Sequence, residues 1–212
     1  VIGAGAPPLG AAYVFSFDET WFETQKLVPD APQANFPSGS FGDSVAISGD
    51  TIAISHTKNS DMETEAGAVH LFDFSGNAWV PSQTLYASNY LHNGHFGYSV
   101  ALNGDVLTVG AQLSSSVSEH QGAAYLFQRT AGAWTQVAEL EASDGAIYDG
   151  FAACVDISES TVVVGAKNNN GKPSEGGFFG VTYGNQGWGA AYVFERTNLC
   201  DVAGECVCKS GY

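Results

Sequence analysis

Positive charge is scarce in this 212-residue chain, and the scarcity excludes two classes of partner. Seven lysines and arginines stand against 22 aspartates and glutamates, which gives a formal net charge of −15 at pH 7. Binding to nucleic acid or to an anionic membrane surface requires a cationic face, so we expect neither partner. The acidic surplus is typical of a soluble exterior that resists aggregation, with cation binding as the alternative.

Long apolar runs are also missing. No segment approaches the roughly 18 to 20 apolar residues of a membrane-spanning helix, so we predict no membrane insertion. The sequence contains no Asn-x-Ser/Thr sequon, and N-glycans therefore give no indication of the compartment. The chain starts directly on strand-like sequence at Val1-Ile2-Gly3-Ala4. We interpret this start as that of a processed or truncated chain.

Glycine and apolar residues are plentiful by contrast. Glycine occurs 26 times, 44% of the residues are hydrophobic and only 14% are charged. This composition is sufficient for a packed core and is typical of many short strands joined by tight turns. We therefore predict an all-β protein.

One short sequence is repeated three times, and its copies begin at Phe41, Phe96 and Phe151, at intervals of 55 residues. The copies read Phe-Gly-Asp-Ser-Val-Ala-Ile, Phe-Gly-Tyr-Ser-Val-Ala-Leu and Phe-Ala-Ala-Cys-Val-Asp-Ile. A repeated unit of about this length is the signature of an array or a propeller.

Each copy continues with a two-residue turn and a second apolar run. The turns are Gly49-Asp50, Gly104-Asp105 and Glu159-Ser160. Glycine first in such a loop suits a type II′ hairpin, so the third turn, which lacks glycine, is predicted to differ. The second runs, at 51–54, 106–109 and 161–164, are apolar at nearly every position. They are predicted to be buried on both faces, like the inner strands of a propeller blade.

Two further strands complete each unit. A Gly-Ala strand that ends in aromatic residues occurs four times, at 10–15, 67–72, 122–127 and 189–194. The small Gly-Ala residues at the start of this strand allow close approach to another backbone. A fourth strand begins at Trp21, Trp79 or Trp134, and we interpret these tryptophans as packing groups. Four strands in about 55 residues make one blade, so we predict a β-propeller with three nearly complete blades and partial ones.

The order Phe-Gly-x-Ser-Val-Ala, then Val-Gly-Ala at 109–111 and 164–166, then Gly-Ala-Ala-Tyr-Val-Phe resembles FG-GAP repeats, the units of integrin α-subunit-like β-propellers. The resemblance covers residues 1–197. It implies an extracellular or cell-surface location and part of a larger propeller of about seven blades. The remaining blades would come from a longer chain, which we favour, or from a partner protein, because an open propeller exposes strand edges and an apolar face.

The calcium loop of the integrin-like version is replaced here by the two-residue turns. Such a turn cannot place six to eight oxygen atoms around Ca²⁺, so calcium is not supported at that position and no cofactor is expected. An acidic loop at 59–65 is a weak candidate for a cation site, against the alternative of a solvated charged loop. Its candidate ligands are Asp61, Glu63 and Glu65.

Cysteine is confined to four positions, and three of them lie in the last 15 residues. The ending Cys-x-Cys-x-x-Gly-Tyr at 206–212 resembles part of an EGF-like module, so residues 198–212 are predicted to form a cysteine-rich, EGF-like fragment with a disulfide framework. A thiol metal site is the competing interpretation. Cys154 is expected to be a buried free thiol, with pairing to Cys200 left open. The disulfide candidates are Cys154, Cys200, Cys206 and Cys208.

Binding is expected in the connectors, because blade strands are committed to packing. The connector of the last blade, between Gly165 and Gly189, is 12 residues longer than its two counterparts. Its glycines, amides and aromatics suit sugar stacking or a protein interface, with packing over the propeller rim as the alternative. The candidate binding residues are Asn168, Asn169, Asn170, Phe178, Phe179, Tyr183 and Trp188.

No residue pattern indicates catalysis, and we predict that the chain is not an enzyme. None of the five histidines stands in a catalytic motif of recognisable spacing. His92 and His95 share one loop, where a metal or pH-sensitive contact is the alternative to a plain surface pair. The sequence favours an extracellular structural or adhesion module for protein–protein contacts or surface assembly. A glycan-binding lectin-type propeller is the alternative.

Overall fold

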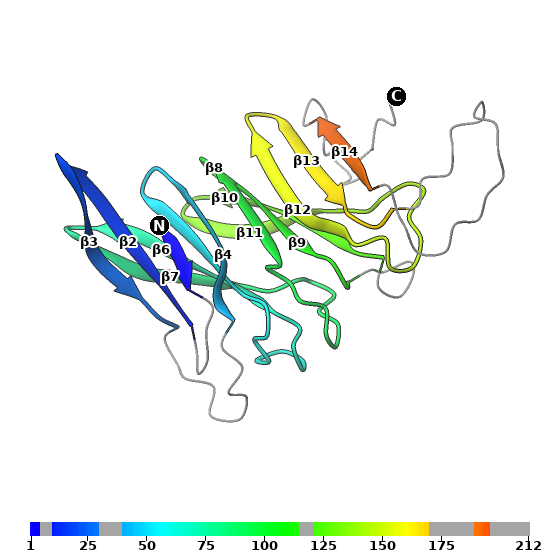
Figure 1. Ribbon diagram of the computed structural model, residues 1–212, viewed down its shortest axis with the longest axis horizontal. Helices are drawn as coiled ribbons and strands as arrows, with labels where there is room; N and C mark the ends of the chain where they lie inside the picture. The colour runs from blue at the N-terminus through cyan, green and yellow to red at the C-terminus, as the bar shows by residue number, and fades with distance from the viewer. Residues whose placement is uncertain (5–9, 30–39, 115–120, 170–188, 196–212) are drawn as a thin grey trace.

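The computed structural model describes residues 1–4, 10–29, 40–114, 121–169 and 189–195. In these residues the chain forms β-strands and no helix. The strands make four antiparallel sheets, which lie side by side in chain order, so that the N-terminal and C-terminal sheets occupy opposite ends of the row (Figure 1). The predicted all-β architecture of propeller blades is confirmed.

The four sheets, called blades 1 to 4, follow the repeat. Blades 2 and 3 have four strands each, and in the described residues blades 1 and 4 have three. Blade 1 is β1 (Ile2–Ala4), β2 (Ala11–Asp18) and β3 (Thr20–Leu27); blade 2 is β4 (Phe41–Ser48), β5 (Thr51–His56), β6 (Ala68–Ser75) and β7 (Ala78–Leu85); blade 3 is β8 (Ser99–Asn103), β9 (Val106–Ala111), β10 (Ala123–Thr130) and β11 (Ala133–Leu140); blade 4 is β12 (Phe151–Ser158), β13 (Thr161–Ala166) and β14 (Ala190–Glu195).

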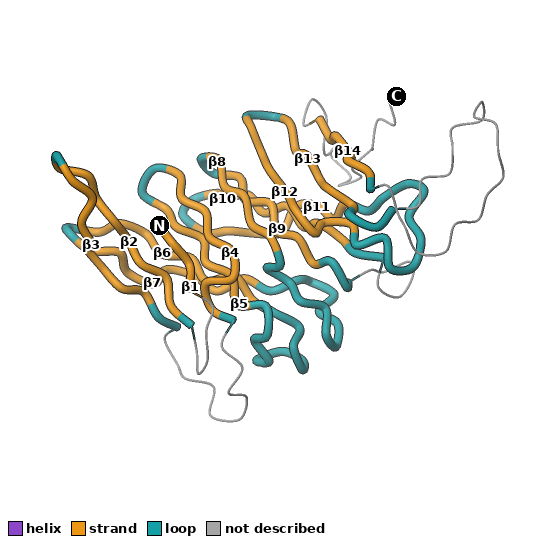
Figure 2. Tube along the Cα trace, in the orientation of Figure 1, coloured by secondary structure: helices purple, strands orange, loops and turns teal. Residues whose placement is uncertain are grey.

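The short turns and the longer connectors lie on opposite edges of the row of blades (Figure 2). In the turns after the first strand, Gly49 and Gly104 have φ of 54° and 55°, as a loop with a left-handed first residue requires. Glu159 adopts φ 51° at the same place. The prediction that the third turn would differ was therefore wrong: the pairing of Ser158 with Thr161 imposes the left-handed residue even without glycine.

Three apolar clusters fill the spaces between successive blades. Every residue of β5 and β9 is buried, as predicted for strands packed between two neighbours. The equivalent strand β13 is different, because Val163 is 40% exposed. The expectation of burial on both faces was wrong for this strand, since no described residue packs as a further blade beyond it.

The glycine that precedes β2, β6 or β10 sets the distance between one blade and the next. Gly10 and Gly67 form isolated parallel bridges with Phe41 and Phe96 at the start of the following blade. A Cβ on Gly67 would overlap the carbonyl oxygen of Phe96, and one on Gly122 that of Phe151. The predicted close approach of backbones is confirmed, and it occurs between blades.

Candidate functional site: the open faces of the terminal blades

Each junction between blades repeats one packing pattern. We call the side of a blade that faces the preceding blade its leading face, and the opposite side its trailing face. At the junction of blades 2 and 3, the large leading-face residues Tyr125, Phe127 and Trp134 pack with the smaller trailing-face residues Ala53, Val69 and Leu71. At the junction of blades 3 and 4, Phe151 and Phe194 pack with Ala124 and Leu126. Large side chains on the leading face thus meet smaller ones on the trailing face.

Hydrogen bonds also recur across the junctions. Ser44 Oγ accepts the N–H of Val100 at 3.1 Å, and Ser99 Oγ accepts the N–H of Val155 at 3.0 Å. In the outer strands, Gln83 Nε2 donates to the carbonyl oxygen of Trp134, and Gln83 Oε1 accepts the N–H of the same residue, both at 2.9 Å. Because these bonds link equivalent positions, they fix the register of one blade on the next.

The leading face of blade 1 carries the same kind of large residues, but without a neighbour in the described structure. Trp21 is 70% exposed and Phe17 is 63% exposed, whereas the equivalent Trp134 is 3% exposed. The two rings of blade 1 contact each other, with centroids 5.3 Å apart. Ile2 on β1 is exposed as well. Trp79 and Trp134 are packing groups as predicted, and Trp21 is the exception.

The trailing face of blade 4 is the second open face. Val193 is 51% exposed, whereas the equivalent Leu71 is 1% exposed. Cys154 and Asp156 on the neighbouring strand β12 are also exposed. Cys154 is a free thiol in the described structure and occupies the position of Ser44 and Ser99. The expectation that it would be buried was wrong, because that position points towards a following blade.

The acidic loop and the histidine loop lie together on the connector edge. His95 Nε2 is 3.3 Å from Glu65 Oε2, and His92 Nδ1 is 3.7 Å from Glu63 Oε1. Asp61 Oδ2 accepts hydrogen bonds from Asn59 Nδ2 and Tyr86 Oη at 2.9 and 3.1 Å. Within the described ranges, no group of three or more His, Cys, Asp or Glu residues is arranged to hold a metal ion. These carboxylates instead tie two connectors to each other.

Two of the binding candidates lie in the described part of the last connector. Asn169 is 2% exposed, and its amide donates to Asp149 Oδ2 at 3.0 Å and to Tyr192 Oη at 2.9 Å. This buried amide anchors the connector, and a role of Asn169 in binding stays a prediction. Asn168 is exposed, and its amide donates to the carbonyl oxygen of Tyr148 at 3.3 Å. The remaining candidates lie outside the described residues: Asn170, Phe178, Phe179, Tyr183, Trp188, Cys200, Cys206 and Cys208.

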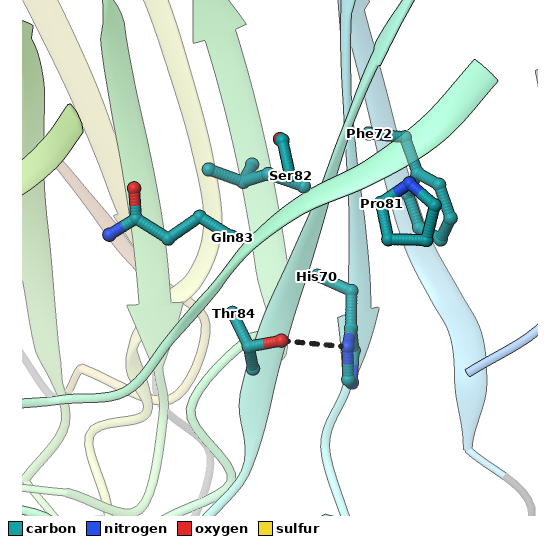
Figure 3. A pocket seen from close by; sticks show the side chains of 7 residues that line it. His70, Phe72, Pro81, Ser82, Gln83 and Thr84 are labelled. Carbon is teal, nitrogen blue, oxygen red and sulfur yellow. Dashed lines mark hydrogen bonds between the residues drawn. The ribbon is translucent and has the colours of Figure 1, made fainter. Parts of the chain in front are cut away.

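A pair of histidines, of which His56 is buried and His70 is half-buried, was not found from the sequence. The rings of His56 and His70 are 5.6 Å apart, and His70 Nδ1 lies 3.2 Å from Thr84 Oγ1 (Figure 3). Burial, with a smaller contribution from the neighbouring His56, lowers the pKa of His70 to about 4. Burial also lowers the pKa of His56. Both rings are therefore neutral at pH 7, which suits packing.

His70 also lines a small cavity of about 180 Å³ together with Phe72, Pro81, Gln83 and Thr84 (Figure 3). Pockets that bind drug-sized ligands usually measure about 300 to 1,000 Å³. The cavity is therefore too small for such a ligand, and the open faces are the stronger candidate for a functional site.

The family assignment agrees with this architecture. A profile described as FG-GAP repeat matches residues 21–72, 79–127 and 134–194. The chain belongs to the FG-GAP repeat family. Each FG-GAP copy begins in the outer strand of one blade (β3, β7 or β11) and ends in a strand of the next blade (β6, β10 or β14). The family unit therefore contains a junction between blades. FG-GAP repeats are found in extracellular adhesion-type proteins such as integrins.

A search of curated protein sequences found no match to the chain. The described part of this FG-GAP protein has no helix with the length and hydropathy needed to span a membrane.

Proposed function

We propose that this chain is an extracellular structural or adhesion module that makes protein–protein contacts through the open faces of its terminal blades. The observation that carries the proposal is the exposure of Trp21. The equivalent tryptophan of blade 3, Trp134, is buried. Folded proteins rarely leave large contiguous apolar patches exposed, and aromatic residues are enriched at protein interfaces. Covering these faces removes apolar surface from water, at roughly 25 cal/mol per Å².

The chemistry of the two faces favours protein as the partner. Their exposed large residues are aromatic or aliphatic: Ile2, Phe17 and Trp21 at one end, Val163 and Val193 at the other. The partner is either another protein or the remaining blades of a longer chain. The net charge of −15 does not favour an anionic polymer as a partner.

The proposal includes no catalytic step and no cofactor. It is supported by the roles of the described histidines. His92 and His95 pair with glutamates on a neighbouring connector, and His56 and His70 are packed against each other. The hydroxyl within reach of His70 is that of Thr84, at 3.2 Å, and the ring it contacts is packed inside a blade.

Site-specific photo-cross-linking in the native protein tests this function. Residue 21 or residue 193 is replaced by a photoreactive phenylalanine analogue. Val80 on β7 is the control position, because it is 40% exposed, as Val163 is, but lies away from both open faces. We expect protein cross-links at 21 and 193 and few at 80. Cross-links concentrated at connector positions such as Tyr90 would contradict the proposal, and tight, specific binding on a glycan array would favour the lectin alternative.

A further inference from the structure

We propose that two copies of this chain associate head to tail, with the leading face of blade 1 in one copy packed on the trailing face of blade 4 in the other. The inference rests on the proposed use of the open faces as protein-contact surfaces, and it names the partner. The two faces lie at opposite ends of the row of blades (Figure 1). Each contact therefore joins two different surfaces, the leading face of one copy and the trailing face of the other.

The open faces continue the pattern of the junctions inside the chain. Inside it, Tyr125, Phe127 and Trp134 of a leading face cover Ala53, Val69 and Leu71 of a trailing face. Blade 1 offers Tyr13, Phe15 and Trp21 at the three leading-face positions, and blade 4 offers Val163, Ala191 and Val193 at the trailing-face positions. Each terminal blade therefore presents one half of an interface of the kind that occurs at the three junctions inside the same molecule.

The two open faces also differ in shape. The leading face of blade 1 projects aromatic side chains, while that of blade 4 is already covered by blade 3, where Phe151 and Phe194 are buried. The trailing face of blade 4 carries the small and β-branched groups Val163, Ala191 and Val193, with Cys154 and Asp156 beside them on β12. Two leading faces would oppose large side chains to large ones, and two trailing faces would leave unfilled space between small ones. Close packing therefore favours a heterologous contact over a symmetric one.

The number of described blades is compatible with a closed assembly. Closed propellers contain about four to eight blades. Two copies of the four described blades make eight, so a head-to-tail pair can close into a ring that uses both open faces of each copy. A heterologous contact that fails to close would produce longer chains of copies. Either assembly covers Trp21 and Val193.

Complementary blocking variants of the 212-residue chain test the proposal. Trp21→Asp blocks the leading face and Val193→Asp blocks the trailing face, and both positions are exposed. We expect the unchanged chain to associate in sedimentation velocity, and each variant alone to associate at least tenfold more weakly. A mixture of the two variants is expected to form a 1:1 dimer, because it retains one intact pair of faces.

Val80→Asp is the matched control and should associate like the unchanged chain. Ile2→Ser and Val163→Lys form a second blocking pair in case an aspartate variant fails to fold, as checked by circular dichroism; Ile2 is exposed, whereas the equivalent Ile54 and Val109 are buried at junctions. A monomeric unchanged chain, or a mixture that does not associate, overturns the head-to-tail contact. If cross-links from positions 21 and 193 then lead to a different protein, the proposed function stands while this inference fails.

Discussion

His70 shows how one residue can differ from its repeat equivalents and change the chemistry of a junction. Tyr125 and Tyr192 occupy the same position in blades 3 and 4, and their hydroxyls are hydrogen-bonded. Tyr125 donates to Asn89 Oδ1 at 2.8 Å, and Tyr192 donates to Asp144 Oδ1 at 2.6 Å. His70 Nε2 and His56 Nδ1 are instead buried without a hydrogen-bond partner in the described structure. A buried, neutral imidazole resists protonation, so this junction is sensitive to acid.

His70→Tyr is expected to reduce the loss of stability in acid. The pKa of His70 is about 4 in the folded chain, below the ordinary value of 6.5. Between pH 6.5 and 4 the unfolded chain binds a proton that the folded chain does not, so the free energy of unfolding falls as the pH falls through this window. The contribution of His70 is on the order of 3 kcal/mol in total. Thermal melts from pH 7 to pH 4 measure it.

The exposed His92 supplies the control for the pH experiment. His92→Gln is expected to leave the slope of melting temperature against pH close to that of the unchanged chain. If His70→Tyr shows the same slope as the unchanged chain, burial of His70 does not govern this part of the pH dependence.

At the level of residues, sequence reasoning succeeded where the backbone decides and failed where neighbours decide. The close approach of Gly67 was predictable, because only a residue without a side chain fits there. The histidine pair was not, because it depends on the register that pairs Ile54 with His70. Cys154 could have been interpreted correctly by aligning it with Ser44 and Ser99, whose hydroxyls reach the following blade.

At the level of elements, the outer strands are linked by a glutamine clamp. Gln25 holds the N–H and the carbonyl group of Trp79, both at 2.8 Å, and Gln83 holds those of Trp134. The position equivalent to Gln83 in blade 3 is Ala138, which is buried in the apolar cluster shared with blade 4. The clamp therefore belongs to the first two junctions.

Gln83→Ala is expected to lower the free energy of unfolding by about 2 kcal/mol, because it leaves a part-buried N–H and carbonyl group of Trp134 without a partner. Urea denaturation followed by tryptophan fluorescence measures the change. Thr135→Ala, on the exposed side of the adjacent strand, is the control and should change stability by less than about 0.5 kcal/mol. Equal effects of the two substitutions would show that the clamp does not stabilise the junction.

The strands themselves were predictable from sequence, and their burial was only partly so. The runs at β9 and β13 are both apolar and both end in Val-Gly-Ala. Sequence pattern therefore predicts the same environment for each. Their burial differs because β9 lies between two blades and β13 has a neighbour on one face only. The apolar sequence pattern identifies a strand surface that is able to pack. The presence of a neighbouring blade determines whether that surface is buried.

At the level of the whole molecule, stability should decrease from the middle blades towards both ends. In repeat proteins each unit gains stability from its own fold and from its junctions with neighbours. Blades 2 and 3 each have two junctions in the described structure, while blades 1 and 4 each have one.

Hydrogen exchange measured on the monomeric Trp21→Asp variant tests this gradient. Backbone amides of β13 are expected to exchange at least tenfold faster than those of β9, a strand of the same length and similar sequence. Amides of β5 should resemble those of β9. Uniform exchange across these three strands would indicate a single cooperative unit instead.

The contact between Gly67 and Phe96 also bears on how such a chain grows during evolution. The bridge joins backbone to backbone, so it demands a glycine and a fixed spacing and little else. A gene duplication that copies 55 residues in frame adds a blade with a matching leading and trailing face, ready to fit between existing blades. Each added blade would bring its own leading and trailing faces, so no new interface would be required. Divergence could then act on the connectors and on the two outermost faces.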